Sequence, residues 1–165
     1  MAGVALPPFQ VKTNCCKNDQ WQPVITVKPD GTRLFVAWYD RRKDTNNNSL
    51  IEAYGCFANL PITGANNFAT NFPISTVQFP PVFAGTNMVD GAYDPAYPPN
   101  FGQCDSRCCG SFEGRYRDHM GDYDMAVPDN DYVYYTWADN RTTSTNHGVN
   151  RNQADVRMVR VSWPK

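Results

Sequence analysis

The chain has 165 residues, which is enough for one domain with a real core. Its 15 basic and 16 acidic residues nearly cancel, so no net field draws the chain to nucleic acid or to an anionic membrane. No apolar run approaches the roughly 20 residues that a membrane-spanning helix needs. A low charged fraction (19%) and a high aromatic fraction (13%) favour strands and long loops over a helical bundle.

The first half of the chain predicts a series of short strands. Dense or alternating apolar residues mark most of them, and the Pro-Asp-Gly turn at 29–31 separates two of them. A pair of prolines in the first segment is typical of an edge strand. The expected strands are 4–13 (the edge strand), 23–28, 33–39, 50–57 and 72–77.

The second half predicts strands at 123–127, 132–138 and 154–163, with a polar loop over 139–153. Its missing fourth strand is expected to come from the N-terminal segment or from a neighbouring chain. Between the two halves, residues 78–118 form an insertion rich in proline, asparagine, glycine and cysteine. A loop of that length usually carries function or is held by covalent links.

Two stretches of the sequence are copies of one another, with a constant offset of 99 residues. Residues 27–42 read V-K-P-D-G-T-R-L-F-V-A-W-Y-D-R-R, and residues 126–141 read A-V-P-D-N-D-Y-V-Y-Y-T-W-A-D-N-R. Such self-similarity marks a repeat architecture in which one unit stacks beside the next. Both copies end in Trp-x-Asp-x-Arg, and these structural repeat residues are Trp38, Asp40 and Arg42 in the first copy and Trp137, Asp139 and Arg141 in the second.

The cysteine count is even, and no paired Cys-x-x-Cys zinc pattern is present. We expect disulfides that tie the segment 56–120 to the N-terminal cysteine pair; a metal site on the three clustered cysteines is the alternative. Disulfides indicate an extracellular, cell-surface or periplasmic location. The cysteines are Cys15, Cys16, Cys56, Cys104, Cys108 and Cys109.

Two further features bear on secretion. Asn47 and Asn140 each begin an Asn-x-Ser/Thr glycosylation pattern. The N-terminal residues have neither the charged region nor the apolar segment of a signal peptide. We expect a piece of a longer secreted protein, or a chain that starts after processing.

The two copies carry a family resemblance. Residues 19–27 (D-Q-W-Q-P-V-I-T-V), Asp30-Gly31 and 36–42 (V-A-W-Y-D-R-R) resemble a blade of the sialidase-like (BNR-repeat) six-bladed β-propellers. Residues 119–123 (H-M-G-D-Y), followed by 134–141 (Y-Y-T-W-A-D-N-R), are similar to the closing blade of that family. The resemblance covers more than half of the chain.

The resemblance implies an all-β fold of two four-stranded antiparallel propeller blades, 19–77 and 119–165, with a disulfide-stapled insertion at 78–118. Two blades are a third of a six-bladed ring. Each blade buries its face on the next, so the resemblance also implies completion by other chains in a homo-oligomer or by the rest of a longer chain.

The functional motifs of the family are missing. Neither its Ser-x-Asp-x-Gly-x-x-Trp box nor its Arg-Ile-Pro motif occurs, and no nucleophile accompanies His119 or His147. We assign no catalytic residue and expect a secreted or surface module that is non-catalytic, assembles with other chains and binds glycans. The alternatives are a C-terminal fragment of an exo-sialidase-like glycoside hydrolase and a structural subunit of an extracellular assembly.

Two groups of residues are candidates for glycan binding. Arg42 and Arg141 could hold a sugar carboxylate in bidentate fashion; the alternative is that each pairs with its neighbouring aspartate to fix a loop. In the insertion, aromatic and basic side chains suit sugar stacking or a protein partner, and the alternative is a local core. The insertion residues are Tyr97, Arg115 and Tyr116.

One loop is a candidate for a cation. Asp44, Asn46 and Asn48 place oxygen atoms at alternate positions, as Ca²⁺ sites do. The alternative is a turn in which these side chains bond their own backbone. We expect no other cofactor.

Overall fold

The computed structural model describes residues 11, 18, 20–45, 50–64, 67–79, 124–146 and 149–165. Every regular element among them is a strand, and the strands form two antiparallel sheets, so the all-β class predicted from the sequence is confirmed. None of these residues belongs to a helix that could cross a membrane. The strands are β1 (Gln20–Val27), β2 (Arg33–Asp40), β3 (Glu52–Asn59), β4 (Phe72–Pro73), β5 (Met125–Pro128), β6 (Tyr132–Asn146) and β7 (Val149–Ser162).

Both copies of the repeat begin with a turn that an aspartate closes. Between β1 and β2, the Asp30 carboxylate accepts a hydrogen bond from the Thr32 backbone N–H at 2.9 Å, and Gly31 takes a positive φ of 73°. Between β5 and β6, the Asp129 carboxylate accepts hydrogen bonds from the backbone of Asp131 at 2.7 Å and Tyr132 at 2.6 Å. Aspartate favours such turns because its short side chain reaches the backbone two residues on.

The first sheet has the order β1-β2-β3-β4, with each strand antiparallel to the next. The second has the order β5-β6-β7. The edge strand predicted at 4–13 and the greater part of the insertion predicted at 78–118 lie outside the described residues, apart from Val11, Gln78 and Phe79.

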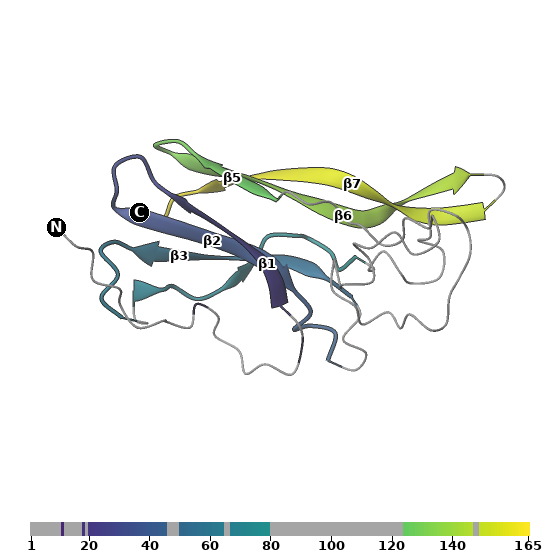
Figure 1. Cartoon of the computed structure of the whole chain (residues 1–165), viewed down its shortest axis with the longest axis horizontal. Helices are drawn as coiled ribbons and strands as arrows, with labels where there is room; N and C mark the ends of the chain where they lie inside the picture. The colour runs from purple at the N-terminus through teal and green to yellow at the C-terminus, as the bar shows by residue number, and fades with distance from the viewer. Residues whose placement is uncertain are drawn as a thin grey trace, which may run out of the picture.

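The polar loop predicted at 139–153 is wrong. After a bulge, β6 and β7 continue as a hairpin in which Thr142 pairs with Gln153 and Asn146 with Val149. The hairpin runs on past the ends of β2 and β3 (Figure 1). Here the backbone ladder satisfies the N–H and C=O groups without an apolar face, so hydrophobic alternation gives no signal of a strand.

The two sheets lie one above the other as two layers (Figure 1) and enclose the main core. The Phe35 ring lies 5.2 Å from the Phe57 ring within the first sheet and 6.3 Å from the Tyr135 ring of the second. Such aromatic pairs add to the free energy gained by burying apolar area. The first sheet contributes Phe35, Ala37, Tyr39, Ala53 and Phe57 to this core, and the second contributes Val133, Tyr135, Trp137 and Trp163.

The opposite face of the first sheet is also buried. Alternate side chains of a strand point to opposite faces, so the residues of β2 and β3 that do not face the second sheet form a separate cluster. They are Leu34, Val36, Trp38, Tyr54, Cys56 and Ala58. Val11, Leu60, Ile62 and Phe68 pack against this cluster.

Candidate functional site

The first Trp-x-Asp-x-Arg cluster surrounds a fully buried carboxylate at the end of β2. Asp40 accepts hydrogen bonds from the Trp38 indole N–H at 2.9 Å and from the Arg42 backbone N–H at 2.7 Å. The Arg42 Nε and Nη2 atoms lie 2.8 and 2.6 Å from the same carboxylate. The guanidinium also sits 4.1 Å from the centre of the Tyr54 ring, a cation–π contact.

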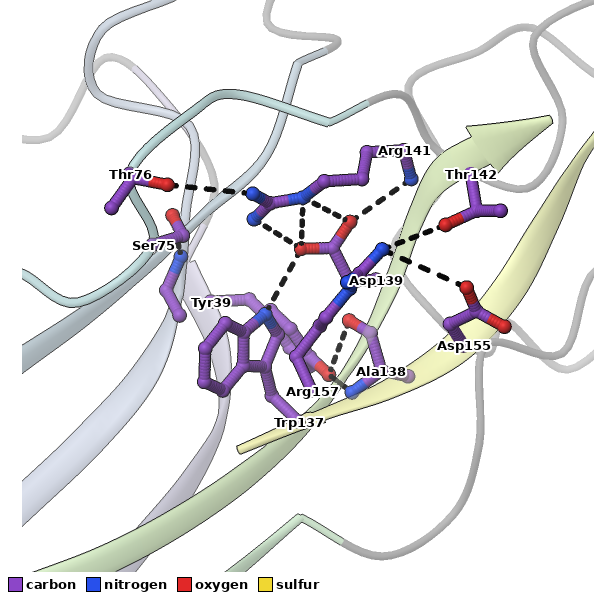
Figure 2. Close-up of polar contacts among 11 residues, drawn as sticks. Tyr39, Ser75, Thr76, Trp137, Ala138, Asp139, Arg141, Thr142, Asp155 and Arg157 are labelled. Carbon is purple, nitrogen blue, oxygen red and sulfur yellow. Dashed lines mark hydrogen bonds and ion pairs between the residues drawn. The ribbon is translucent and has the colours of Figure 1, made fainter. Parts of the chain in front are cut away.

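The second cluster repeats this arrangement in β6. Asp139 is fully buried and accepts hydrogen bonds from the Trp137 indole at 3.3 Å, the Arg141 backbone N–H at 2.9 Å and Arg141 Nε at 2.8 Å. The carboxylate lies between the indole and the guanidinium (Figure 2). On the side of the guanidinium that faces away from Asp139, Arg141 Nη1 lies 3.5 Å from the Thr76 hydroxyl of the segment that follows β4. The second arginine therefore reaches towards the first sheet.

The arginine–aspartate pairs fix the chain at the end of β2 and at the bulge within β6. Each arginine directs two nitrogen atoms to one carboxylate, and its side chain is 13% (Arg42) or 25% (Arg141) exposed. Bidentate pairs of this kind are charge-assisted and specific in geometry. Arg42 and Arg141 belong to different sheets, each with its own aspartate, so the structure gives them the geometry of the loop-fixing alternative.

A polar cluster links the two sheets. The Tyr39 hydroxyl of β2 lies 2.9 Å from Asp124 Oδ1, and the Tyr135 hydroxyl of β6 lies 3.4 Å from Asp124 Oδ2. Burial raises the pKa of Asp124 to about 6, an effect that the hydrogen bonds from the two tyrosines and from the Ala138 backbone partly offset. Burial, with the nearby Asp124 charge, also raises the pKa of both tyrosines.

The Tyr39 hydroxyl also takes the place of strand pairing at the edge of β6. β5 pairs with β6 only as far as Met125 opposite Thr136. Two residues further on, the Ala138 N–H donates to the Tyr39 hydroxyl at 2.9 Å, and the Ala138 carbonyl oxygen lies 3.2 Å from that hydroxyl (Figure 2). One side chain of the first sheet thus accepts a hydrogen bond from a backbone N–H that β5 does not pair.

This inter-sheet cluster has the titratable groups of an acid–base site, but a substrate cannot reach them. Tyr39 and Tyr135 are both fully buried in the core, so a substrate could not reach their hydroxyls without separating the sheets. The cluster is therefore a polar bridge that fixes the registration of one sheet on the other. Sequence reasoning missed it because its partners are 85 residues apart.

The 99-residue repeat offers no signal for this bridge. Tyr39 is replaced by Ala138, but this is one of many differences between residues 27–42 and 126–141, and Asp124 precedes the second copy.

The predicted cation loop is closed by its own backbone in the part that the structure describes. The Asp44 side chain accepts a hydrogen bond from the Leu50 N–H at 2.8 Å, and the Asp44 carbonyl accepts one from the Asn18 amide at 2.7 Å. Asn46 and Asn48 lie outside the described residues, as do Tyr97, Arg115 and Tyr116. Within the described ranges, no three His, Cys, Asp or Glu side chains gather as a metal site would require.

Cys56 has a free, buried thiol instead of the disulfide predicted for it. Its Sγ lies 3.0 Å from the Ala69 carbonyl oxygen, and burial raises the pKa of the thiol. β3 places Cys56 on the covered face of the first sheet, where it packs as a small apolar side chain. The other five cysteines lie outside the described residues.

A shallow pocket of about 210 Å³ lies beside the end of β3. Asn67 lines it, but its Oδ1 already accepts hydrogen bonds from the Thr63 and Gly64 backbones at 2.9 and 3.0 Å. The Asn67 side chain therefore stabilises the loop that contains it. The lining residues are Arg33, Phe57, Ala58, Asn59, Asn67, Phe68, Ala69 and Pro164.

The two copies of the repeat stack in one direction. The face of the second sheet that carries Trp137 packs against the face of the first sheet that carries Phe35, Ala37 and Tyr39, which is opposite to the face of Trp38. The stacking therefore joins unlike faces, as in a head-to-tail series.

The other face of the second sheet carries exposed apolar side chains. Four of its apolar side chains are exposed, and the register of β5, β6 and β7 sets three of them beside Thr136 or Tyr134 on that face. We call this set the outer face: Met125 (56% exposed), Val127 (50%), Val156 (81%) and Met158 (67%).

Comparisons with protein-family models, with curated proteins and with solved structures found no match. The function must therefore be argued from the geometry of the chain.

Proposed function

We propose that this chain is a non-catalytic, sialidase-like propeller module that works by assembly, at a cell surface or outside the cell. Its two sheets would be two blades, and further blades from other copies or from a longer chain would complete the ring. Three copies supply six blades. Glycan binding is part of the proposal and belongs to the insertion residues Tyr97, Arg115 and Tyr116.

The observation that carries the proposal is the head-to-tail stacking of two copies of one repeat. The face that carries Trp137 in the second copy covers the opposite face of the first, while the outer face of the second copy carries four exposed apolar side chains. Stacked repeats bury a continuous core only when each unit covers the next, and large exposed apolar patches mark interaction sites.

The arginine geometry supports a non-catalytic role. Arg42 and Arg141 would be the natural anchors for a sugar acid, yet each is bonded to a buried aspartate of its own sheet. Asp124, whose pKa is raised to about 6, is bonded to tyrosines inside the core. A general acid needs contact with its substrate, which this position does not offer.

Molar mass by light scattering tests the proposal. We expect an assembled species, with a trimer for a closed six-bladed ring, and no hydrolysis of a fluorogenic sialoside. A folded monomer at all concentrations would contradict assembly, and sialoside turnover by the purified chain would contradict the non-catalytic role. Loss of binding on a glycan array in Tyr97→Ala or Tyr116→Ala would support the glycan part, and undiminished binding would remove those residues from it.

A further inference from the structure

We propose that a second copy of this chain covers the outer face, and that it does so head to tail, with β1 of one copy against β5 of the other. The proposal rests on the proposed assembly and adds which faces meet. It follows from the contact that already exists inside the chain.

The internal contact supplies the template. Within one chain, β1 of the first sheet lies against β5 of the second, and Tyr39 of the first sheet bonds Asp124 beside β5. In the proposed contact, the second sheet of one copy takes the role that the first sheet has inside the chain. The first sheet of another copy takes the role that the second sheet has inside the chain.

Both surfaces needed for this contact are exposed and apolar. On β1, Ile25 is 63% exposed and Val27 is 42% exposed. Their register opposite Val36 and Leu34 sets them on the face of the first sheet that carries Trp38, equivalent to the buried Trp137 face of the second. The opposing surface is the outer face, with Met125, Val127, Val156 and Met158 exposed.

The covered part of the first sheet sets where the second copy sits. Leu60, Ile62 and Phe68 pack over β2 and β3 on this face. The opening is therefore at β1, and the contact is centred on Ile25 and Val27 against Met125 and Val127. Each such contact uses the β1 surface of one copy and the outer face of another. Every copy can therefore bind two others, and the assembly ends only when it closes into a ring.

Two charge substitutions and their mixture test the proposal. Met125→Glu disrupts the outer face and leaves β1 intact, whereas Ile25→Glu disrupts β1 and leaves the outer face intact. Each variant alone should be a monomer under conditions in which the wild-type chain assembles. An equal mixture should form a dimer and stop there, because only one wild-type contact can be made per pair.

The controls are Asn130→Glu, in the exposed turn between β5 and β6, and Asn59→Glu, at the exposed end of β3; both should assemble like the wild type. Tryptophan fluorescence should show that all four variants are folded, since the substituted side chains are exposed. Light scattering and native mass spectrometry give the masses.

The possible results separate this proposal from the proposed function. If the wild type assembles but either single variant still assembles as the wild type does, the head-to-tail contact is wrong while assembly stands. If Met125→Glu is a monomer and Ile25→Glu forms a dimer by itself, the outer faces of two copies meet each other, and the proposal is overturned. A wild-type monomer at every concentration removes the proposed assembly and this contact together.

Discussion

The two sheets carry the same local cluster but differ in what surrounds them. Asp40 and Asp139 make nearly the same hydrogen bonds, to a tryptophan and to an arginine two residues further on. In the described part of the chain, however, the first sheet is covered on both faces of β2 and β3, whereas the outer face of the second carries exposed apolar side chains. The comparison shows that a repeat fixes the local hydrogen bonds, while position in the stack decides how much each face is buried.

The largest expected difference is between Phe35 and Tyr134, which occupy equivalent positions in the repeat. Phe35 is fully buried between the sheets, so Phe35→Ala should lower the free energy of unfolding by about 3–5 kcal/mol. Tyr134 lies on the outer side of β6, so Tyr134→Ala should cost less than about 1 kcal/mol in the monomeric chain. Urea denaturation of both variants measures this. Equal losses would mean that the two faces are not buried differently.

Substitution of Asp40 and of Asp139 should lower the free energy of unfolding by similar amounts, in contrast to Phe35 and Tyr134. Asp40→Ala and Asp139→Ala each remove the carboxylate that accepts hydrogen bonds from an indole N–H, a backbone N–H and a guanidinium. We expect each substitution to cost about 2–3 kcal/mol, since hydrogen bonds to charged groups are the stronger kind. Thermal unfolding of the two variants should give similar shifts. A large cost at one site and none at the other would contradict the shared geometry.

A smaller effect is expected at the bridge between the sheets. Tyr39→Phe keeps the ring but removes the hydroxyl that bonds Asp124 and the Ala138 backbone. The loss should be about 1–2 kcal/mol, the usual cost of leaving buried polar groups unsatisfied. Tyr132→Phe, on the partly exposed outer side of β6, is the matched control and should have little effect. Chemical denaturation distinguishes them.

The smallest expected effect is a pH dependence from the same bridge. The pKa of Asp124 is raised from an ordinary value of 3.8 to about 6 in the folded chain. The folded state thus holds the proton more tightly than the unfolded state. The contribution of this group is fully present below its unfolded pKa and is lost as the pH rises through about 6.

The urea midpoint should accordingly fall from pH 5 to pH 7.5, and Asp124→Asn should flatten that part of the profile. The groups bonded to this carboxyl are Tyr39 of β2, Tyr135 of β6 and the Ala138 backbone, and none of them titrates in that range. An unchanged profile in Asp124→Asn would assign the pH dependence to another residue.

Sequence patterns predicted the strands with apolar faces and failed where the signal is not hydrophobic. Residues 33–39 and 132–138 were recognisable because one or both faces enter a core. The polar hairpin continuing to Asn146 has a backbone ladder but no apolar alternation, so its sequence pattern predicts a loop. The repeat indicates that Trp38 and Trp137 lie on equivalent faces of their strands. It does not indicate that the two sheets would pack together through unlike faces.

The candidate site was predictable only within each copy. Trp-x-Asp-x-Arg is a local pattern, so its hydrogen bonds follow from one strand end. The contact between Tyr39 and Asp124 depends on how two distant segments stack, which composition and spacing do not encode. Cys56 shows the same limit, since an even number of cysteines says nothing about which of them is buried in a core.

The stacking of the second sheet on the first is tested most directly by a double-mutant cycle on Tyr39→Phe and Asp124→Ala, measured by urea denaturation. Because the hydroxyl and the carboxylate lie 2.9 Å apart across the two sheets, we expect a coupling free energy of about 1 kcal/mol. Strictly additive losses would show that the two side chains do not meet, and would contradict the stacked arrangement.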